Sequence, residues 1–160
     1  MKELEEIRIK RILTPTDFSE LSLCTLQYST ALARQFGAKI SILHVISQEW
    51  ISEMNAIQAF AVPIGSVEEL LEKKKRDSIE RMEEIIKKED EALFEGSIIK
   101  VGIPSEEIIG VAKEREIDLI VICTHGRSGL SHVFMGSVAE KVVRRSPCPV
   151  LSVRGQSIKE

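Results

Sequence analysis

The chain has 160 residues, 43% of them hydrophobic and 29% charged, and a net charge of −3. This length suits one domain, residues 1–160, and the composition is typical of a folded globular protein rather than a disordered one. The acidic balance excludes a global basic field that would attract nucleic acid or an anionic membrane. An aromatic content of 4% leaves few rings to stack against single-stranded nucleic acid.

The cysteines and the chain start indicate a cytoplasmic protein. Cys24, Cys123 and Cys148 are widely spaced and form no CxxC pair, so neither a disulfide framework nor a zinc site is indicated. The first six residues are acidic and lack the apolar segment of a secretory signal. No apolar run approaches the length of a membrane span.

Strand and helix patterns alternate along the first half of the chain. Residues 47–66 show no clean period and are predicted to be a long connection with room for a short helix. The basic run 73–76 is balanced by glutamates and is interpreted as a solvated helix face rather than a docking patch. The predicted elements are a strand at 9–14, a helix at 20–36 with Ser19 and Gly37 as its caps, a strand at 39–46, and an amphipathic helix from Val67 to about Glu89.

The second half continues the alternation. Its predicted elements are a strand at 96–101, a helix from a cap at Ser105 to about Glu116, a strand at 119–123, a helix at 137–145 and a strand at 150–154, with 155–160 as a frayed tail. This order predicts an α/β fold of the Rossmann-like type: an open five-stranded parallel sheet with helices on both faces. Periodicity does not give the order of the strands.

A glycine-bearing loop follows the buried strand 119–123 and leads into the helix at Ser137. Gly126, Gly129 and Gly136 can allow close backbone approach, and a helix start offers unpaired N–H groups and partial positive charge. Ser137 adds a hydroxyl at that helix start. The alternative is that the glycines only form turns and Ser137 only caps its helix. The first interpretation predicts binding of a nucleotide or another phosphorylated small molecule.

The end of the first strand carries a second group of polar residues. If this strand and the strand at 119–123 are neighbours where the strand order reverses, their loops converge on one cleft. Asp17 could then hold a ribose or an adenine edge, or it could only cap the first helix or form an Asx-turn. His44 and His125 are interpreted as packed or backbone-bonded rather than catalytic, and Cys123 as an inert core thiol.

Several nucleotide-related motifs are absent. The chain has no GxxxxGK[ST] and no GxGxxG after the first strand, which excludes a P-loop NTPase and leaves a dinucleotide site unsupported. A phosphoacceptor receiver domain needs an acidic pair after its first strand, where this chain has Thr16-Asp17.

Two segments, 12–19 (ILTPTDFS) and 124–130 (THGRSGL) continuing to 136–143 (GSVAEKVV), resemble the universal stress protein family. The resemblance covers nearly the whole chain and implies the adenine nucleotide alpha hydrolase-like α/β fold and a homodimer. Some members of this family bind ATP and others do not. The ATP-binding pattern is glycine, two residues, glycine, nine residues, then glycine with Ser or Thr. Gly126 and Gly136-Ser137 match this pattern, whereas Cys123 occupies the first glycine position.

By position, the resemblance implies a set of nucleotide-binding residues. Pro15, Thr16, Asp17 and Val45 would surround the adenosine, Ile122 would form an apolar wall, and the ribose and phosphates would face Gly126, Arg127, Gly129, Gly136, Ser137 and Val138. Mg²⁺ or Mn²⁺ would be held mostly by phosphate oxygens, because the sequence shows no acidic cluster for it.

Three functional hypotheses follow from these observations. The first is an ATP-binding module that regulates a stress response, and the second is a slow ATP hydrolase, for which no catalytic residue is identified. The third is a dimeric interaction protein without nucleotide, in which Cys123 marks lost binding. In each case residues 150–154 would form an edge strand that pairs with a second copy.

Overall fold

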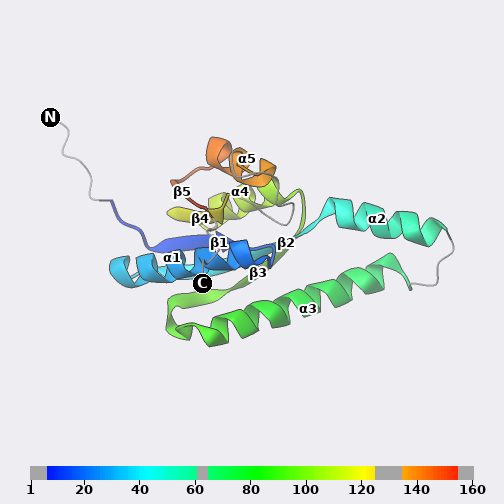
Figure 1. Cartoon of the computed structure of the whole chain (residues 1–160), viewed down its shortest axis with the longest axis horizontal. Helices are drawn as coiled ribbons and strands as arrows, with labels where there is room; N and C mark the ends of the chain where they lie inside the picture. The colour runs from blue at the N-terminus through cyan, green and yellow to red at the C-terminus, as the bar shows by residue number, and fades with distance from the viewer. Residues whose placement is uncertain (1–6, 61–64, 125–134, 155–160) are drawn as a thin grey trace, which may run out of the picture.

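The computed structural model describes residues 7–60, 65–124 and 135–154. The helices and strands lie in two layers of helices with a sheet between them, and a pair of helices projects to one side (Figure 1). The strands are β1 (Arg11–Pro15), β2 (Lys39–Ser47), β3 (Phe94–Gly102), β4 (Leu119–Cys123) and β5 (Val150–Val153). The helices are α1 (Glu20–Phe36), α2 (Gln48–Ala59), α3 (Val67–Lys88), α4 (Pro104–Glu114) and α5 (Ser137–Arg145), with a 3₁₀ turn at Glu91–Leu93.

All paired strands are parallel, in the order β3-β2-β1-β4-β5. The chain therefore builds outward from β1 through β2 to β3 and then crosses to the other side of β1 for β4. The strand order reverses between β1 and β4, which is where open α/β sheets bind their ligands. The predicted five-stranded parallel fold is confirmed, and the two strands with unusual loops are neighbours.

Alternating side chains of the sheet pack into two separate cores. On one face, Leu13 and Ile120 lie against α4 and α5, through residues such as Val111 and Val142. On the other face, Ile12 packs toward α1, and Ile42 packs against Met82 of α3. Helices therefore cover both faces, which is why the central strands are apolar on both sides and read as continuous hydrophobic runs.

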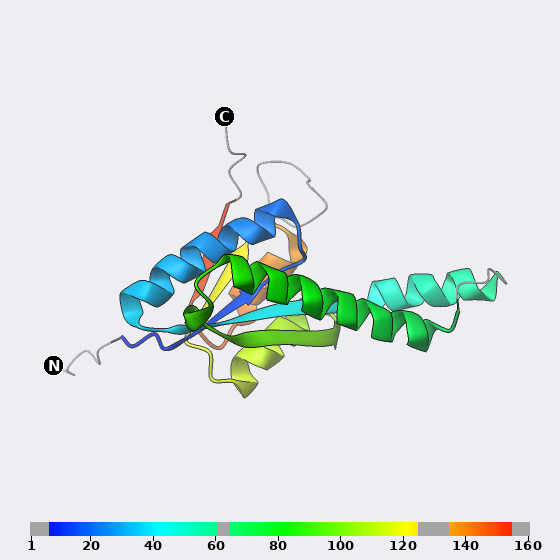
Figure 2. The same ribbon diagram turned by 90° about the horizontal axis from the view of Figure 1, so that it is seen from below.

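Helix α2 replaces much of the long connection predicted for 47–66. Ser47 caps it by accepting a 3.3 Å hydrogen bond from the Trp50 amide, and Trp50 and Met54 lie half-buried one turn apart. The pattern is weak because none of the residues of α2 is fully buried. Figure 2 shows α2 and the first half of α3 side by side as an arm that extends beyond the sheet.

The caps predicted for α1 are confirmed, whereas the cap predicted for α4 is wrong. Ser19 and Gly37 bound α1 as predicted, and Gly37 has a positive φ of 66°. Helix α4 begins at Pro104 rather than after a cap at Ser105, and its N-cap is Ile103. Proline fits the first helical position, because its fixed φ suits the helix and no amide partner is lost there.

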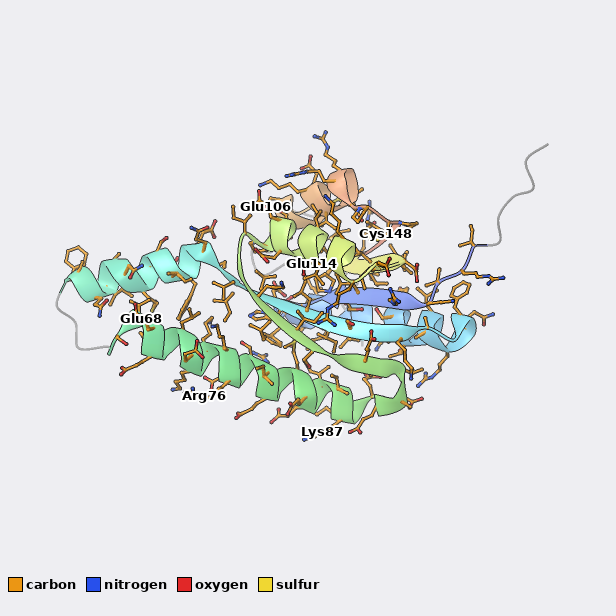
Figure 3. All side chains as sticks on the ribbon, turned by 180° about the vertical axis from the view of Figure 1, so that it is seen from behind. Glu68, Arg76, Lys87, Glu106, Glu114 and Cys148 are labelled. Atoms are coloured by element: carbon orange, nitrogen blue, oxygen red, sulfur yellow. The ribbon has the colours of Figure 1, made fainter. Side chains whose placement is uncertain are left out.

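The long helix α3 has a solvated outer side. Arg76 and Lys87 are exposed and lie along the side that faces away from the sheet, and Glu68 is exposed at the start of the helix, in the part beside α2 (Figure 3). Within the basic run 73–76, Lys73 and Arg76 are exposed as predicted, whereas Lys74 and Lys75 are half-buried. Lys75 pairs with Glu72 at 2.8 Å, and Lys74 turns toward α2.

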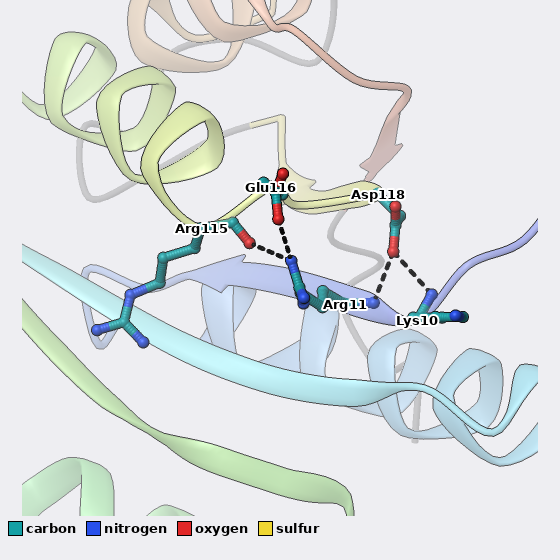
Figure 4. Close-up of polar contacts among 5 residues, drawn as sticks. All are labelled: Lys10, Arg11, Arg115, Glu116 and Asp118. Carbon is teal, nitrogen blue, oxygen red and sulfur yellow. Dashed lines mark hydrogen bonds and ion pairs between the residues drawn. The ribbon is translucent and has the colours of Figure 1, made fainter.

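The amino ends of β1 and β4 are joined by Asp118. Its Oδ2 accepts hydrogen bonds from the amides of Lys10 and Arg11 at 2.8 and 2.9 Å (Figure 4). The Arg11 guanidinium donates in turn to the Arg115 carbonyl and pairs with Glu116. This network fixes the two central strands at the edge of the sheet opposite their carboxyl ends.

Candidate functional site

A cleft of about 420 Å³ lies at the carboxyl ends of β1, β2 and β4. Its lining comes from the ends of these three strands, the starts of α1, α2, α4 and α5, and one residue of α3. The lining residues are Pro15, Thr16, Asp17, Ser22, Leu43, His44, Val45, Ile46, Ser47, Glu49, Trp50, Lys74, Pro104, Ile108, Ile122, Cys123, Thr124, Gly136, Ser137, Val138 and Ala139.

The structure brings together most of the residues that were predicted from the sequence to bind a nucleotide. Pro15, Thr16, Asp17, Val45, Ile122, Gly136, Ser137 and Val138 all line this one cleft. Gly126, Arg127 and Gly129, together with His125, lie outside the described residues. The end of β1 and the described residues on either side of the predicted glycine loop therefore meet at one site.

The floor beside β1 is held by Thr16. Its amide donates to the Leu43 carbonyl at 2.8 Å, which continues the β1–β2 ladder by one residue. Its hydroxyl shares a 2.9 Å hydrogen bond with the Ser22 hydroxyl and accepts from the Phe18 amide. Buried hydroxyls with several partners are rigid, so this part of the cleft has a fixed shape.

Asp17 forms the turn into α1. Its Oδ1 accepts from the Ser19 amide at 3.0 Å and from the Ser19 hydroxyl at 2.6 Å, which is the Asx-turn considered from the sequence. Ser19 in turn accepts from the Ser22 amide and caps the helix. Asp17 therefore has a structural task and lines the cleft as well.

His44 is packed, as the sequence indicated. Its Nδ1 lies 2.8 Å from the Thr16 carbonyl and must donate, since a carbonyl only accepts. Its ring lies 4.4 Å from the ring of Phe18, measured between centroids. This hydrogen bond fixes the ring nitrogen that carries the proton.

The carbonyl of Thr124 and the amide of Gly136 are joined by a 2.6 Å hydrogen bond. This bond fixes the start of α5 against the end of β4. Gly136 has φ −61° and ψ 151°, a conformation open to any residue, so its backbone angles do not require glycine. What glycine gives at this position is the absence of a Cβ at the cleft wall.

The start of α5 differs from those of α1, α2 and α3, which are capped by the hydroxyls of Ser19, Ser47 and Ser66. No described side chain caps α5. Its first residues, Ser137 and Val138, line the cleft. Amides at a helix start carry partial positive charge and bind anions well.

Cys123 ends β4 and is buried, with 8% of its surface exposed. It belongs to the cleft lining without filling the cleft, which keeps about 420 Å³. The backbone of the next residue is fixed, because the Thr124 amide donates to the Val153 carbonyl at 2.9 Å.

Trp50 and Lys74 are cleft residues that the sequence interpretation missed. The Lys74 Nζ lies 4.8 Å from the centroid of the Trp50 ring, so a cation–π contact joins α2 to α3 at the cleft wall. Trp50 follows directly after β2, on the same edge of the sheet as Asp17. Its position just after a strand could have predicted that Trp50 lines the cleft. Nothing in the sequence predicts that Lys74 does.

An open parallel sheet with a cleft where its strand order reverses defines a doubly wound α/β domain of the Rossmann-like type. The sequence profile of the universal stress protein family matches residues 8–154, and the chain belongs to this family.

Known relatives agree with that assignment. Universal stress protein MJ0577 of Methanocaldococcus jannaschii is 34% identical over 156 residues, covering 92% of this chain and 96% of its own. YxiE of Bacillus subtilis is 32% identical and covers 90% of this chain and 98% of its own. The MJ0577 structure superimposes with a TM-score of 0.79, covering 94% and 99% of the two chains. A universal stress protein in complex with cAMP shares the fold, with a TM-score of 0.63, 21% identity, and 93% and 99% coverage.

Within the described residues, no group of three or more His, Cys, Asp or Glu side chains is placed to hold a metal ion. None of the helices in the described part of the chain is long and apolar enough to cross a membrane.

Proposed function

We propose that this universal stress protein binds ATP in the cleft between β1 and β4 and acts as a nucleotide-responsive regulatory module. The observation that carries the proposal is the start of α5. Its first turn, which no described side chain caps, lies on the cleft wall, at the segment that matches the glycine-serine end of the family's ATP-binding pattern. A triphosphate there would accept hydrogen bonds from the amides of Ser137 and Val138.

The rest of the cleft suits a nucleoside. With phosphate at α5, the ligand extends across the end of β1 toward β2. Val45 and Ile122 offer apolar contact, and Thr16 and Asp17 add polar atoms whose positions are fixed by their own hydrogen bonds. A cleft that combines apolar walls with a few fixed polar groups is typical of small-molecule sites.

A divalent cation would enter with the ligand. Mg²⁺ or Mn²⁺ commonly binds phosphate oxygens and keeps several waters, so it needs few protein ligands. The role of this chain would be to orient the triphosphate at α5. A hydrolytic role requires a group that positions water, and the described part of the cleft supplies no assigned residue for it.

Cys123 is relevant to the alternative hypothesis, a dimeric interaction protein that binds no nucleotide. It is the one departure from the family pattern, yet the cleft beside it keeps its volume. A cysteine is small, so we expect it to narrow this end of the cleft rather than close it. This favours binding over a purely structural dimer.

Assembly through β5 belongs to the same proposal. β5 is an edge strand with β4 as its neighbour. The carbonyls of Pro149 and Val153 bond to β4, so the main-chain groups of Val150 and Ser152 face the other way. These outward groups are available for pairing with a second copy, in a homodimer.

Isothermal titration with ATP and Mg²⁺ tests the proposal. We expect saturable heat with about one nucleotide per chain, and a dissociation constant below about 0.1 mM, the weak limit of such a measurement. Absence of heat with the folded protein at that concentration would exclude ATP binding and favour the interaction protein. Release of phosphate during the same incubation would support the hydrolase instead of a pure binding module.

A further inference from the structure

Trp50 and Lys74 form a wall of the cleft that the family's nucleotide pattern does not include. Trp50 lies in the first turn of α2, and Lys74 lies about two turns from the start of α3. Both line the cleft, and the Lys74 ammonium lies 4.8 Å from the indole centroid. The ammonium is attracted to the negative face of the aromatic ring, and this attraction holds the indole in place.

The position of this wall decides which part of a nucleotide it can meet. β2 and β4 lie on opposite sides of β1. The anion-binding start of α5 follows β4, whereas Trp50 follows β2. A nucleotide with its phosphates at α5 therefore directs its base toward Trp50.

Charge supports the same orientation. Glu49, beside Trp50, also lines the cleft, and its carboxylate would repel a phosphate at this end. Lys74 forms no ion pair with any described carboxylate, and its described partner is the indole of Trp50. The Glu49 carboxylate and the Lys74 ammonium carry opposite charges in the same wall, so the wall combines an aromatic surface with little net charge, which suits a neutral, flat base.

We propose that Trp50 contacts the base of the bound nucleotide, and that Lys74 is a positioning residue that holds the indole at the cleft wall. This rests on the proposed ATP binding and adds to it a contact that determines preference for the base. Stacking of a base on an aromatic side chain contributes enough that its removal weakens binding about fivefold or more.

The chain has a single tryptophan, so its fluorescence reports on this wall alone. We expect ATP and adenosine to quench or shift the Trp50 emission, and inorganic triphosphate to leave it unchanged. Quenching by inorganic triphosphate would place Trp50 at the phosphate end and overturn the proposal.

Substitutions at Trp50 and Lys74 distinguish a contact with the base from a purely structural role of these side chains. In calorimetry, Trp50→Ala should weaken ATP binding about fivefold or more, while Trp50→Phe keeps a ring and most of the affinity. Lys74→Met should weaken ATP binding and Lys74→Arg should restore it, because arginine also stacks on aromatic faces. Lys73→Met, on the exposed neighbour, is the matched control and should have no effect.

The outcomes distinguish this contact from ATP binding itself. If wild-type protein binds ATP with unchanged Trp50 emission, and Trp50→Ala binds ATP as well as wild type, the wall has no role and the binding proposal stands. If wild-type protein takes up no ATP, both proposals fail.

Discussion

The 2.6 Å hydrogen bond from the Gly136 amide to the Thr124 carbonyl connects the end of β4 to the start of α5. It occupies the Gly136 amide, so the amides available to a ligand begin one residue later, at Ser137. The bond ties the start of α5 to the end of β4 before any ligand is bound. An anion site built this way is preorganised, which lowers the cost of binding.

Gly136→Val tests the cleft wall at this point. The backbone angles of Gly136 are open to valine, so we expect the variant to fold. Its branched side chain would stand where the phosphates approach, and ATP affinity should fall roughly tenfold or more by calorimetry.

Gly110→Ala is the matched control for that substitution. Gly110 lies inside α4, where an added Cβ meets no atom within 4 Å. Alanine should therefore raise the free energy of unfolding by about 0.5–1 kcal/mol in denaturant titration and leave ATP affinity unchanged. A loss of ATP affinity in Gly110→Ala as large as that in Gly136→Val would contradict a local effect at the cleft.

Substitutions at Cys123 test the departure from the family pattern. Cys123→Ala shortens a side chain at the cleft, so ATP affinity should stay within about twofold of wild type. Cys123→Phe should fill the cleft and abolish the heat of ATP binding while the far-UV circular dichroism persists. Equal ATP affinity in both variants would place the ligand elsewhere.

Asp118→Ala should affect stability and leave ligand binding intact. Its carboxylate accepts from two main-chain amides at the amino ends of the central strands, remote from the cleft (Figure 4). We expect a loss of about 1–2 kcal/mol in the free energy of unfolding, since hydrogen bonds to a charged acceptor are lost at an exposed site. Normal ATP affinity of the folded variant would agree with this; a tenfold loss would not.

The pH dependence of stability should include a contribution from Cys148. Burial raises the pKa of its thiol above the ordinary value of 9.0, against a lowering by the hydrogen bond with Ser146. The folded protein thus holds the thiol proton more tightly than the unfolded chain. This contribution is fully present below the ordinary pKa and is lost as the pH rises through the folded-state pKa. Above pH 9.0 the free energy of unfolding of wild type, measured in urea, should therefore fall relative to that of Cys148→Ala.

The β4–β5 register shows which substitution in β5 tests the predicted dimer. Leu151 has the same orientation as Pro149 and Val153, whose carbonyls bond to β4, so Leu151→Pro would damage the sheet itself. Ser152→Pro removes an outward amide instead and should lower the measured mass from dimer to monomer in light scattering. A wild-type monomer across micromolar concentrations would contradict pairing through β5.

The sequence predicted those parts of the fold that depend on local pattern. The apolar run of β4, the Ser19 and Gly37 caps of α1 and the amphipathic face of α3 all carry their signal in neighbouring residues. Helix α2 was predicted only as a possible short helix within a long connection, because it buries no residue fully and its apolar face is narrow. The strand order depends on contacts between distant segments, and local periodicity does not encode it.

The residues of the site likewise fall into those that local sequence predicted and those that it did not. Asp17, Gly136 and Ser137 were predicted because they follow strands β1 and β4 and carry recognisable turn or helix-start chemistry. Lys74 was interpreted as part of a solvated face because its neighbours Lys73 and Arg76 are. Its place on the cleft wall depends on the α2–α3 arm, a tertiary arrangement that no short motif specifies.

A crystal structure of the protein with ATP and Mg²⁺ is the most direct test. We predict a triphosphate whose oxygens accept hydrogen bonds from the amides of Ser137 and Val138, with the base on the β2 side of Asp17. A nucleotide bound elsewhere, or an empty cleft at a saturating ATP concentration, would contradict a phosphate site at the start of α5.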